Sequence, residues 1–150
     1  MYTVILAIHN VVRWIVLVLI LVALVRAYRG WLGKCDWSDT DRKAGSFLGM
    51  AIDTQLLLGL ILYIFLSPIT RTAFQNFGAA MQVPDVRFFA IEHILYMLLA
   101  VVFVHVGSVL SRKAVEPVAK HQRAALWFSL ALVVILVGMP WTRPLLPGLG

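Results

Sequence analysis

The sequence predicts an all-α integral membrane protein, an antiparallel four-helix transmembrane bundle with both termini outside. Three observations support this fold class: the composition, four long apolar stretches, and the distribution of basic residues. Of the 150 residues, 61% are hydrophobic and only 13% are charged, whereas about a quarter of the residues in soluble domains are charged. This composition is typical of a membrane protein, and the length leaves room for one domain covering residues 1–150.

Four apolar stretches are long enough to cross a bilayer, because about 30 Å of hydrocarbon requires roughly 20 helical residues. They cover residues 3–27, 44–66, 88–111 and 124–141. Residues 69–82, between the second and third stretches, are too polar to span. Within them Phe74, Phe77 and Met81 recur at spacings of three and four residues, which predicts a short amphipathic helix on the outer surface.

Basic residues are concentrated in two of the connections between these stretches. The first and third connections contain Arg26, Arg29, Lys34, Arg42 and Lys43, and Arg112, Lys113, Lys120 and Arg123. The second connection and the C-terminal tail contain only Arg71, Arg87 and Arg143. Because cytoplasmic loops collect Lys and Arg, we expect the first and third connections inside and both termini outside. The same bias accounts for the net charge of +6 without a nucleic-acid partner.

Two histidines near the outer ends of different helices are the main candidate site. His9 lies roughly 9 Å inside the first span and His93 roughly 8–9 Å inside the third, at about 1.5 Å per residue. Two imidazoles at one depth on facing helices are what is needed to hold a haem b iron as axial ligands. Two other interpretations remain open: interhelical hydrogen bonds or a headgroup-level position, and coordination of another metal or pigment.

Charged residues lie close to both histidines along the chain. Arg13 shares a helix face with His9, whereas Glu92 points roughly 100° away from His93. We expect an ion pair between Arg13 and Glu92, or else a Glu92 that handles protons or contacts quinone. Arg13 and Arg87 are the expected partners of the haem propionates.

Three further polar residues need an explanation. Asp53, near mid-membrane, is expected to be buried, neutral or hydrogen-bonded, to carry protons, or to balance a cofactor charge. His105 lies about 120° around the helix from His93, which favours a structural role. His121 is expected to be a solvated loop histidine, although His121 and Asp53 are also secondary candidates for a cofactor site.

Several other chemistries are excluded by the sequence. Cys35 is the single cysteine, so the chain cannot form an intrachain disulfide. The motif Cys-x-x-Cys-His is absent, which excludes covalent c-type haem attachment. The sequence also has no glycine-rich phosphate loop and no Glu-x-x-His di-iron motif.

A set of short motifs runs along nearly the whole chain. They are His9-x-x-x-Arg13-Trp14, Gly30-Trp31-Leu32-Gly33-Lys34, Gln55-Leu56-Leu57-Leu58-Gly59-Leu60 through Tyr63, Arg87-Phe88-Phe89-Ala90-Ile91-Glu92-His93, Ala119-Lys120-His121 and Pro140-Trp141. In these motifs the chain resembles short four-helix bacterial membrane proteins known as cytochrome b-like. The resemblance implies haem binding and a multi-pass protein of the bacterial inner membrane.

The resemblance also bears on the number of cofactor sites. In that family the second helix carries a histidine where this chain has Asp53, and that histidine would form an inner pair with His121. Aspartate is a poor axial ligand for a low-spin b haem, so the resemblance implies one haem, on the outer side.

The sequence therefore predicts a small b-type cytochrome that carries electrons rather than a self-contained enzyme. His9 and His93 would ligate the iron, and Arg13, Arg87 and Glu92 would surround the cofactor. Its expected partners are the lipid bilayer, other membrane redox subunits and, as a candidate, quinone. The alternatives are a cofactor-free accessory or assembly subunit of a respiratory or photosynthetic complex, and a subunit that binds a chlorin pigment.

Overall fold

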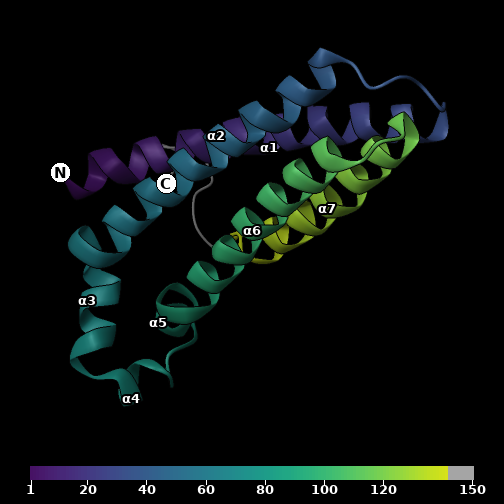
Figure 1. Ribbon diagram of the computed structural model, residues 1–150. Helices are drawn as coiled ribbons and strands as arrows, with labels where there is room; N and C mark the ends of the chain where they lie inside the picture. Colours follow the sequence, from purple (N-terminus) through teal and green to yellow (C-terminus); the bar gives the residue numbers. More distant parts are fainter. Residues whose placement is uncertain (142–150) are drawn as a thin grey trace.

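The computed structural model describes residues 1–141 and builds them almost entirely from helices (Figure 1). Along the chain these are α1 (Tyr2–Leu32), α2 (Asp39–Ile61), the π-helical turn η1 (Leu62–Leu66), α3 (Pro68–Gln75), α4 (Phe77–Ala80), α5 (Pro84–Arg87), the π-helical turn η2 (Phe88–Glu92), α6 (His93–Lys113) and α7 (Pro117–Val137). Arg143, counted above, lies outside the described residues.

Four helical segments within residues 1–141 are long and apolar enough to cross a membrane. They are Tyr2–Leu32, Asp39–Leu66, Pro84–Lys113 and Pro117–Val137. The four predicted spans are thus confirmed as apolar helices. The fourth begins and ends earlier than predicted, because Pro117 starts a helix readily at its first turn and Gly138 follows its last residue.

The four long helices form a ring in which each packs against two others. α1 contacts α2 and α7, and α6 contacts α7 and α2. The connection between α1 and α2 lies at the same end of the molecule as that between α6 and α7, whereas α3, α4 and α5 lie at the other end (Figure 1). This arrangement places residues far apart in sequence, on α1 and α6 above all, around one interior.

Small residues let the helices approach one another closely. The buried residues of α7 include Ala124, Ala125 and Ala131, which are at most 1% exposed. They face a core whose largest fully buried apolar side chains are Ile20, Leu48 and Val104, from α1, α2 and α6. Alanine permits the short interaxial distances on which packing between membrane helices depends.

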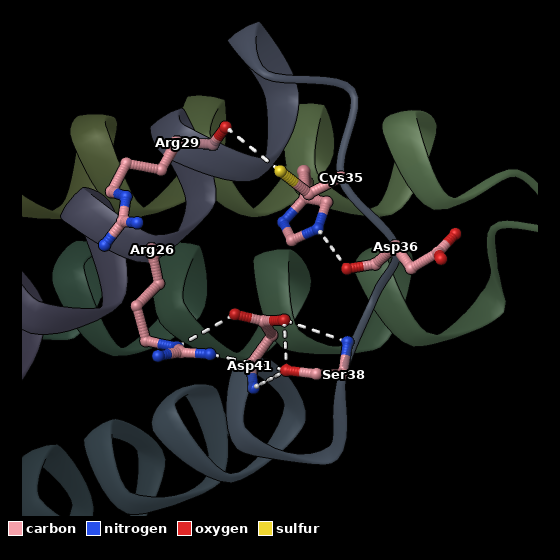
Figure 2. Close-up of polar contacts among 7 residues, drawn as sticks. Arg26, Arg29, Cys35, Asp36, Ser38 and Asp41 are labelled. Atoms are coloured by element: carbon pink, nitrogen blue, oxygen red, sulfur yellow. Dashed lines mark hydrogen bonds and ion pairs between the residues drawn. The ribbon is translucent and has the colours of Figure 1, made fainter.

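The connection between α1 and α2 is held by a network of hydrogen bonds at the start of α2 (Figure 2). Ser38 is the N-cap residue, and its hydroxyl oxygen accepts a hydrogen bond from the backbone N–H of Asp41 at 3.3 Å. In return Asp41 accepts from the backbone N–H of Ser38 at 2.9 Å, which completes a capping box. Asp41 also forms an ion pair with Arg26 of α1 at 2.8 Å, so the cap fastens α2 to α1.

The predicted amphipathic helix over residues 69–82 is divided into two. Asn76 ends α3 with φ −145° and ψ 80°, outside the helical region. Its side-chain oxygen then accepts from the backbone N–H of Ala79 at 3.1 Å and caps α4. Asparagine competes with the helix for backbone donors, and this explains the break within an otherwise amphipathic segment.

Candidate functional site

The structure brings His9 of α1 and His93 of α6 together. Their ring centres are 6.4 Å apart, with an angle of 69° between the ring planes. The equal depths predicted for these two residues therefore correspond to a direct juxtaposition across the interior of the bundle.

The orientation of His93 is set by the end of α7. Its Nδ1 lies 2.7 Å from the carbonyl oxygen of Gly138, and because a carbonyl only accepts, Nδ1 carries the proton. Gly138 follows the last residue of α7, where helix carbonyls lack their usual partners. This tautomer leaves Nε2 of His93 unprotonated and able to ligate a metal.

The backbone at Gly138 also lies close against α6. A Cβ atom at this position would fall 2.6 Å from both Tyr96 Cβ and Met97 Cε. Only glycine allows the backbone, and with it the carbonyl that orients His93, to come so near.

His9 is held by the second span. Its Nε2 lies 3.3 Å from Nε2 of Gln55 on α2. In this amide orientation the N–H donates to the ring, and the proton of a neutral His9 lies on Nδ1. Nδ1 of His9 is buried and has no hydrogen-bond partner among the described residues. Gly59, one turn beyond Gln55, makes room for the ring, since a Cβ there would lie 3.3 Å from His9 Cε1.

In each imidazole of the pair, one nitrogen is hydrogen-bonded to the protein and the other is not. The nitrogens without such a bond are Nδ1 of His9 and Nε2 of His93. Of these two, Nδ1 of His9 is buried without a partner among the described residues, and such an atom costs about 1–3 kcal/mol.

Both rings line a cavity of about 550 Å³ between α1, α2 and α6. This volume is within the range of cofactor sites, roughly 300–1,000 Å³. Most of the lining is apolar, and its polar members include His9, Asn10, Arg13, Gln55, Tyr63 and His93. A mainly apolar cavity with a few convergent polar groups is typical of a cofactor or small-molecule site.

The two π-helical turns border this cavity and contribute Tyr63 and Phe89 to its lining. A π-turn leaves a backbone carbonyl without its regular helical partner, and two hydroxyl groups meet this need. Tyr63 of η1 donates to the carbonyl of Ala90 in η2 at 2.7 Å. Thr70 of α3, only 2% exposed, donates to the carbonyl of Tyr63 at 2.8 Å. The Tyr63 bond joins the second and third spans just before His93 begins α6, and the Thr70 bond fastens α3 to η1.

The charged residues predicted around the site are divided between its interior and its edge. Arg13 is buried and lines the cavity. Glu92 forms an ion pair with Arg87 at 2.8 Å, where the sequence predicted Arg13 as its partner. The physical reason is η2, because a π-turn has more residues per turn than an α-helix and brings side chains five apart onto one side. Neither Arg87 nor Glu92 is among the cavity-lining residues.

His121 is not the solvated loop residue that the sequence predicted. It lies within α7, is 1% exposed, and packs over Gly30 of α1, where any Cβ atom would overlap its ring. Its Nε2 lies 3.3 Å from the carbonyl oxygen of Asp36, and its ring centre lies 4.8 Å from that of Trp37. His121 therefore packs at the end of the bundle where α1 connects to α2, and it is not among the cavity-lining residues.

Asp53 and His105 form a pair of their own. His105 Nε2 of α6 lies 2.8 Å from Asp53 Oδ1 of α2. The contact gives Asp53 the expected hydrogen bond, but its side chain is 53% exposed rather than buried, because it lies on the outer face of α2 and α6. Neither residue lines the cavity.

Sequence reasoning missed three parts of the site: the amide of Gln55, the carbonyl of Gly138 and the hydroxyl of Tyr63. A signal for Gln55 was present, because it recurs at helical spacing with the buried residues Leu48 and Ile52. No comparable signal marks Gly138, whose role depends on a backbone atom.

Comparison of the chain with protein-family models, with curated proteins and with solved structures finds no match. A functional assignment therefore depends on the residues and geometry described above.

Proposed function

We propose that the chain is a b-type cytochrome of the bacterial inner membrane that carries electrons between other membrane redox components. In this proposal its helices form an antiparallel multi-pass bundle with both termini on the outer side, supported by the basic residues of the first and third connections. One haem b lies in the outer half, in the cavity between α1, α2 and α6.

The observation that carries the proposal is the geometry of His9 and His93. A metal–imidazole bond of about 2 Å, with about 1 Å more to each ring centre, gives roughly 6 Å between the centres of two axial imidazoles. The observed separation is 6.4 Å. Rotation of each ring about its own metal bond leaves the interplanar angle unrestricted, so 69° is compatible with axial ligation.

The remaining features of the site fit the same group. With the Gln55 amide turned so that its oxygen, which is buried without a partner among the described residues, accepts from Nε2–H of His9, the buried Nδ1 of His9 is unprotonated and able to ligate a metal. Nδ1 of His93 donates to a carbonyl, which is the outer-shell contact that metal-bound histidines usually make. The bound haem would supply a one-electron redox centre.

The protein residues bind and orient this centre and keep water from it. The apolar lining, with Met97 and Met139 among its members, lowers the local dielectric and disfavours added charge. Arg13 adds one positive charge to the lining and offers an N–H donor to the haem carboxylates. Electron donors and acceptors would be other membrane redox subunits or quinone, reached through the bilayer.

The absorption spectrum of the purified protein, expressed with a haem precursor and then titrated with hemin, tests the proposal. We expect the reduced-minus-oxidised bands of a low-spin b haem at one haem per chain. His9→Ala and His93→Ala should each abolish the low-spin spectrum. His105→Gln is the matched control, because it alters a histidine of α6 outside the cavity and should keep the spectrum.

Other outcomes would refute the proposal. A protein that stays colourless after titration with hemin would favour a cofactor-free subunit. A far-red band would identify a chlorin, for which a single histidine suffices. Persistence of the low-spin bands in either alanine variant would show that the ligands have been wrongly assigned.

A further inference from the structure

The outer face of α2 and α6 contains a feature that haem binding does not use. Asp53 and His105 pair with each other at 2.8 Å, yet their side chains are 53% and 50% exposed. Both lie well inside membrane-length helices, so the exposed side of the pair faces the bilayer. Ionisable groups within membrane spans almost always face protein or water, so a lone copy of the chain leaves this pair in an unfavourable environment.

The surroundings of the pair are apolar on both helices. Its exposed neighbours at helical spacing are Met50 and Leu57 of α2 and Leu98, Val102 and Val109 of α6. Thr54, also on this face, donates its hydroxyl to the carbonyl of Met50 at 2.8 Å and needs no further partner. The pair is therefore the one polar feature of this face, which we call the α2–α6 face, that still requires covering.

The pair itself indicates what covers it. Only Asp53 Oδ1 and His105 Nε2 take part in their contact, and the second carboxylate oxygen and Nδ1 have no hydrogen bond among the described residues. The second carboxylate oxygen of Asp53 and Nδ1 of His105 are thus both available for a further hydrogen bond, and they lie at the same depth. Such a pattern is complementary to itself after a rotation of 180° about the membrane normal, because Asp53 then faces His105 of the second copy and the reverse.

We propose that the α2–α6 face is the contact between two copies of this chain, joined by a four-membered cluster of two Asp53 and two His105 side chains. In the cluster, Nε2 of each His105 keeps its contact with its own Asp53, and the second carboxyl oxygen of each Asp53 meets Nδ1 of His105 of the second copy. Every polar atom of the cluster then has a partner, which reduces the cost of burial. A two-fold axis along the membrane normal also inserts both copies in the same orientation.

Cross-linking in native membranes tests whether this face is an interface. Cys35 is the single cysteine of the chain, so Cys35→Ser gives a cysteine-free background. In it, Val102→Cys places a thiol on the α2–α6 face, one turn from His105. Val18→Cys is the matched control, because Val18 is similarly exposed on α1, a helix that packs against α2 and α7. We expect a cross-linked dimer with a short bis-maleimide at Val102→Cys and none at Val18→Cys.

Exchange of the two residues tests the polar cluster itself. Asp53→His or His105→Asp alone would place like groups across the axis and should lower cross-linking about tenfold, as expected for the loss of about two hydrogen bonds within a membrane. The double variant Asp53→His/His105→Asp restores Asp opposite His between identical copies and should recover the dimer. Differently tagged wild-type and double-variant chains, expressed together, should each pair with themselves and pair with each other about tenfold less.

Three results would overturn the proposed contact between copies. The first is equal cross-linking at Val102→Cys and Val18→Cys, and the second is wild-type chains that pair equally well with the double variant. The third is cross-linking from Val102→Cys to a different protein alone, which would show that the face belongs to another partner. The helical circular dichroism of each variant confirms that a lost dimer does not reflect a lost fold. Because the readout is pairing, the result does not depend on haem.

Discussion

The Nδ1–H group of His93 donates to the carbonyl oxygen of Gly138 at 2.7 Å, so the end of α7 determines which nitrogen of a histidine on α6 is free. The same histidine lies with its ring centre 6.4 Å from that of His9 on α1. Three helices therefore act together on one imidazole pair: two of them carry the rings, and the third orients one of them through its backbone.

The first prediction concerns this backbone contact. In Gly138→Ala the new Cβ would lie 2.6 Å from Tyr96 Cβ, which displaces the carbonyl that orients His93. We expect haem affinity to fall about 10- to 100-fold, the usual cost of losing an outer-shell contact, as measured by hemin titration. Gly78→Ala is the control, since a Cβ there meets nothing within 4 Å. Equal affinity of the two variants would show that the carbonyl does not orient His93.

The second prediction concerns the amide that holds His9. Gln55→Leu keeps the apolar volume in the bundle but removes the amide that contacts His9 Nε2. We expect the ring to lose its fixed orientation, with haem dissociating about tenfold faster in transfer to apomyoglobin. Gln82→Leu, at an exposed position after α4, should leave the rate unchanged. A dissociation rate unaffected by Gln55→Leu would mean that Gln55 does not support the ligand.

The third prediction concerns the charge in the cavity lining. A positive charge beside a redox centre favours its reduced form, so Arg13→Gln should lower the midpoint potential. One unit charge at about 8 Å and an effective dielectric constant of 20 contributes about 2 kcal/mol, or on the order of 90 mV for one electron. Potentiometric titration measures this shift, and Arg112→Gln at the other end of α6 should give little change. An unchanged or raised potential in Arg13→Gln would contradict the proposed position of the haem.

The fourth prediction concerns the packing of α7 against α1 and is independent of any cofactor. Gly30→Ala forces a methyl group into the ring of His121, and overpacking of this kind costs about 1–3 kcal/mol. We expect a lower thermal unfolding midpoint in detergent. The double variant Gly30→Ala/His121→Ala should lose less stability than the two single variants lose together, because it removes the clash. Simple additivity would contradict the direct contact.

The helices themselves were predictable because a bilayer imposes a length. Once about 20 consecutive residues are apolar, hydrocarbon forces them into a hydrogen-bonded helix, and counting residues from its end gives the depth of His9 and of His93. These quantities depend on position along one helix only. The four apolar helices were predicted on this basis, and so was the equal depth of the two histidines.

Contacts between helices were not predictable in this way. Glu92 was assigned to Arg13 by depth, but the π-turn η2 rotates it toward Arg87. His121 was placed in solvent because it follows a basic connection, but the missing side chain of Gly30 on another helix opens a place for its ring. In each case the outcome depends on rotation about a helix axis or on the surface of a neighbour, and neither can be read from one segment.

The sequence by itself determined that this chain forms four apolar membrane-length helices and that two of them carry a histidine at one depth, because composition and residue spacing act locally. The tertiary structure alone decided that the two rings meet over a cavity, and that a glutamine and a helix-end carbonyl each hold one of their nitrogens. It also decided that Asp53 and His105 pair on the outer face of α2 and α6. These features depend on which faces of four helices turn toward one another, and that is settled by packing of the whole bundle.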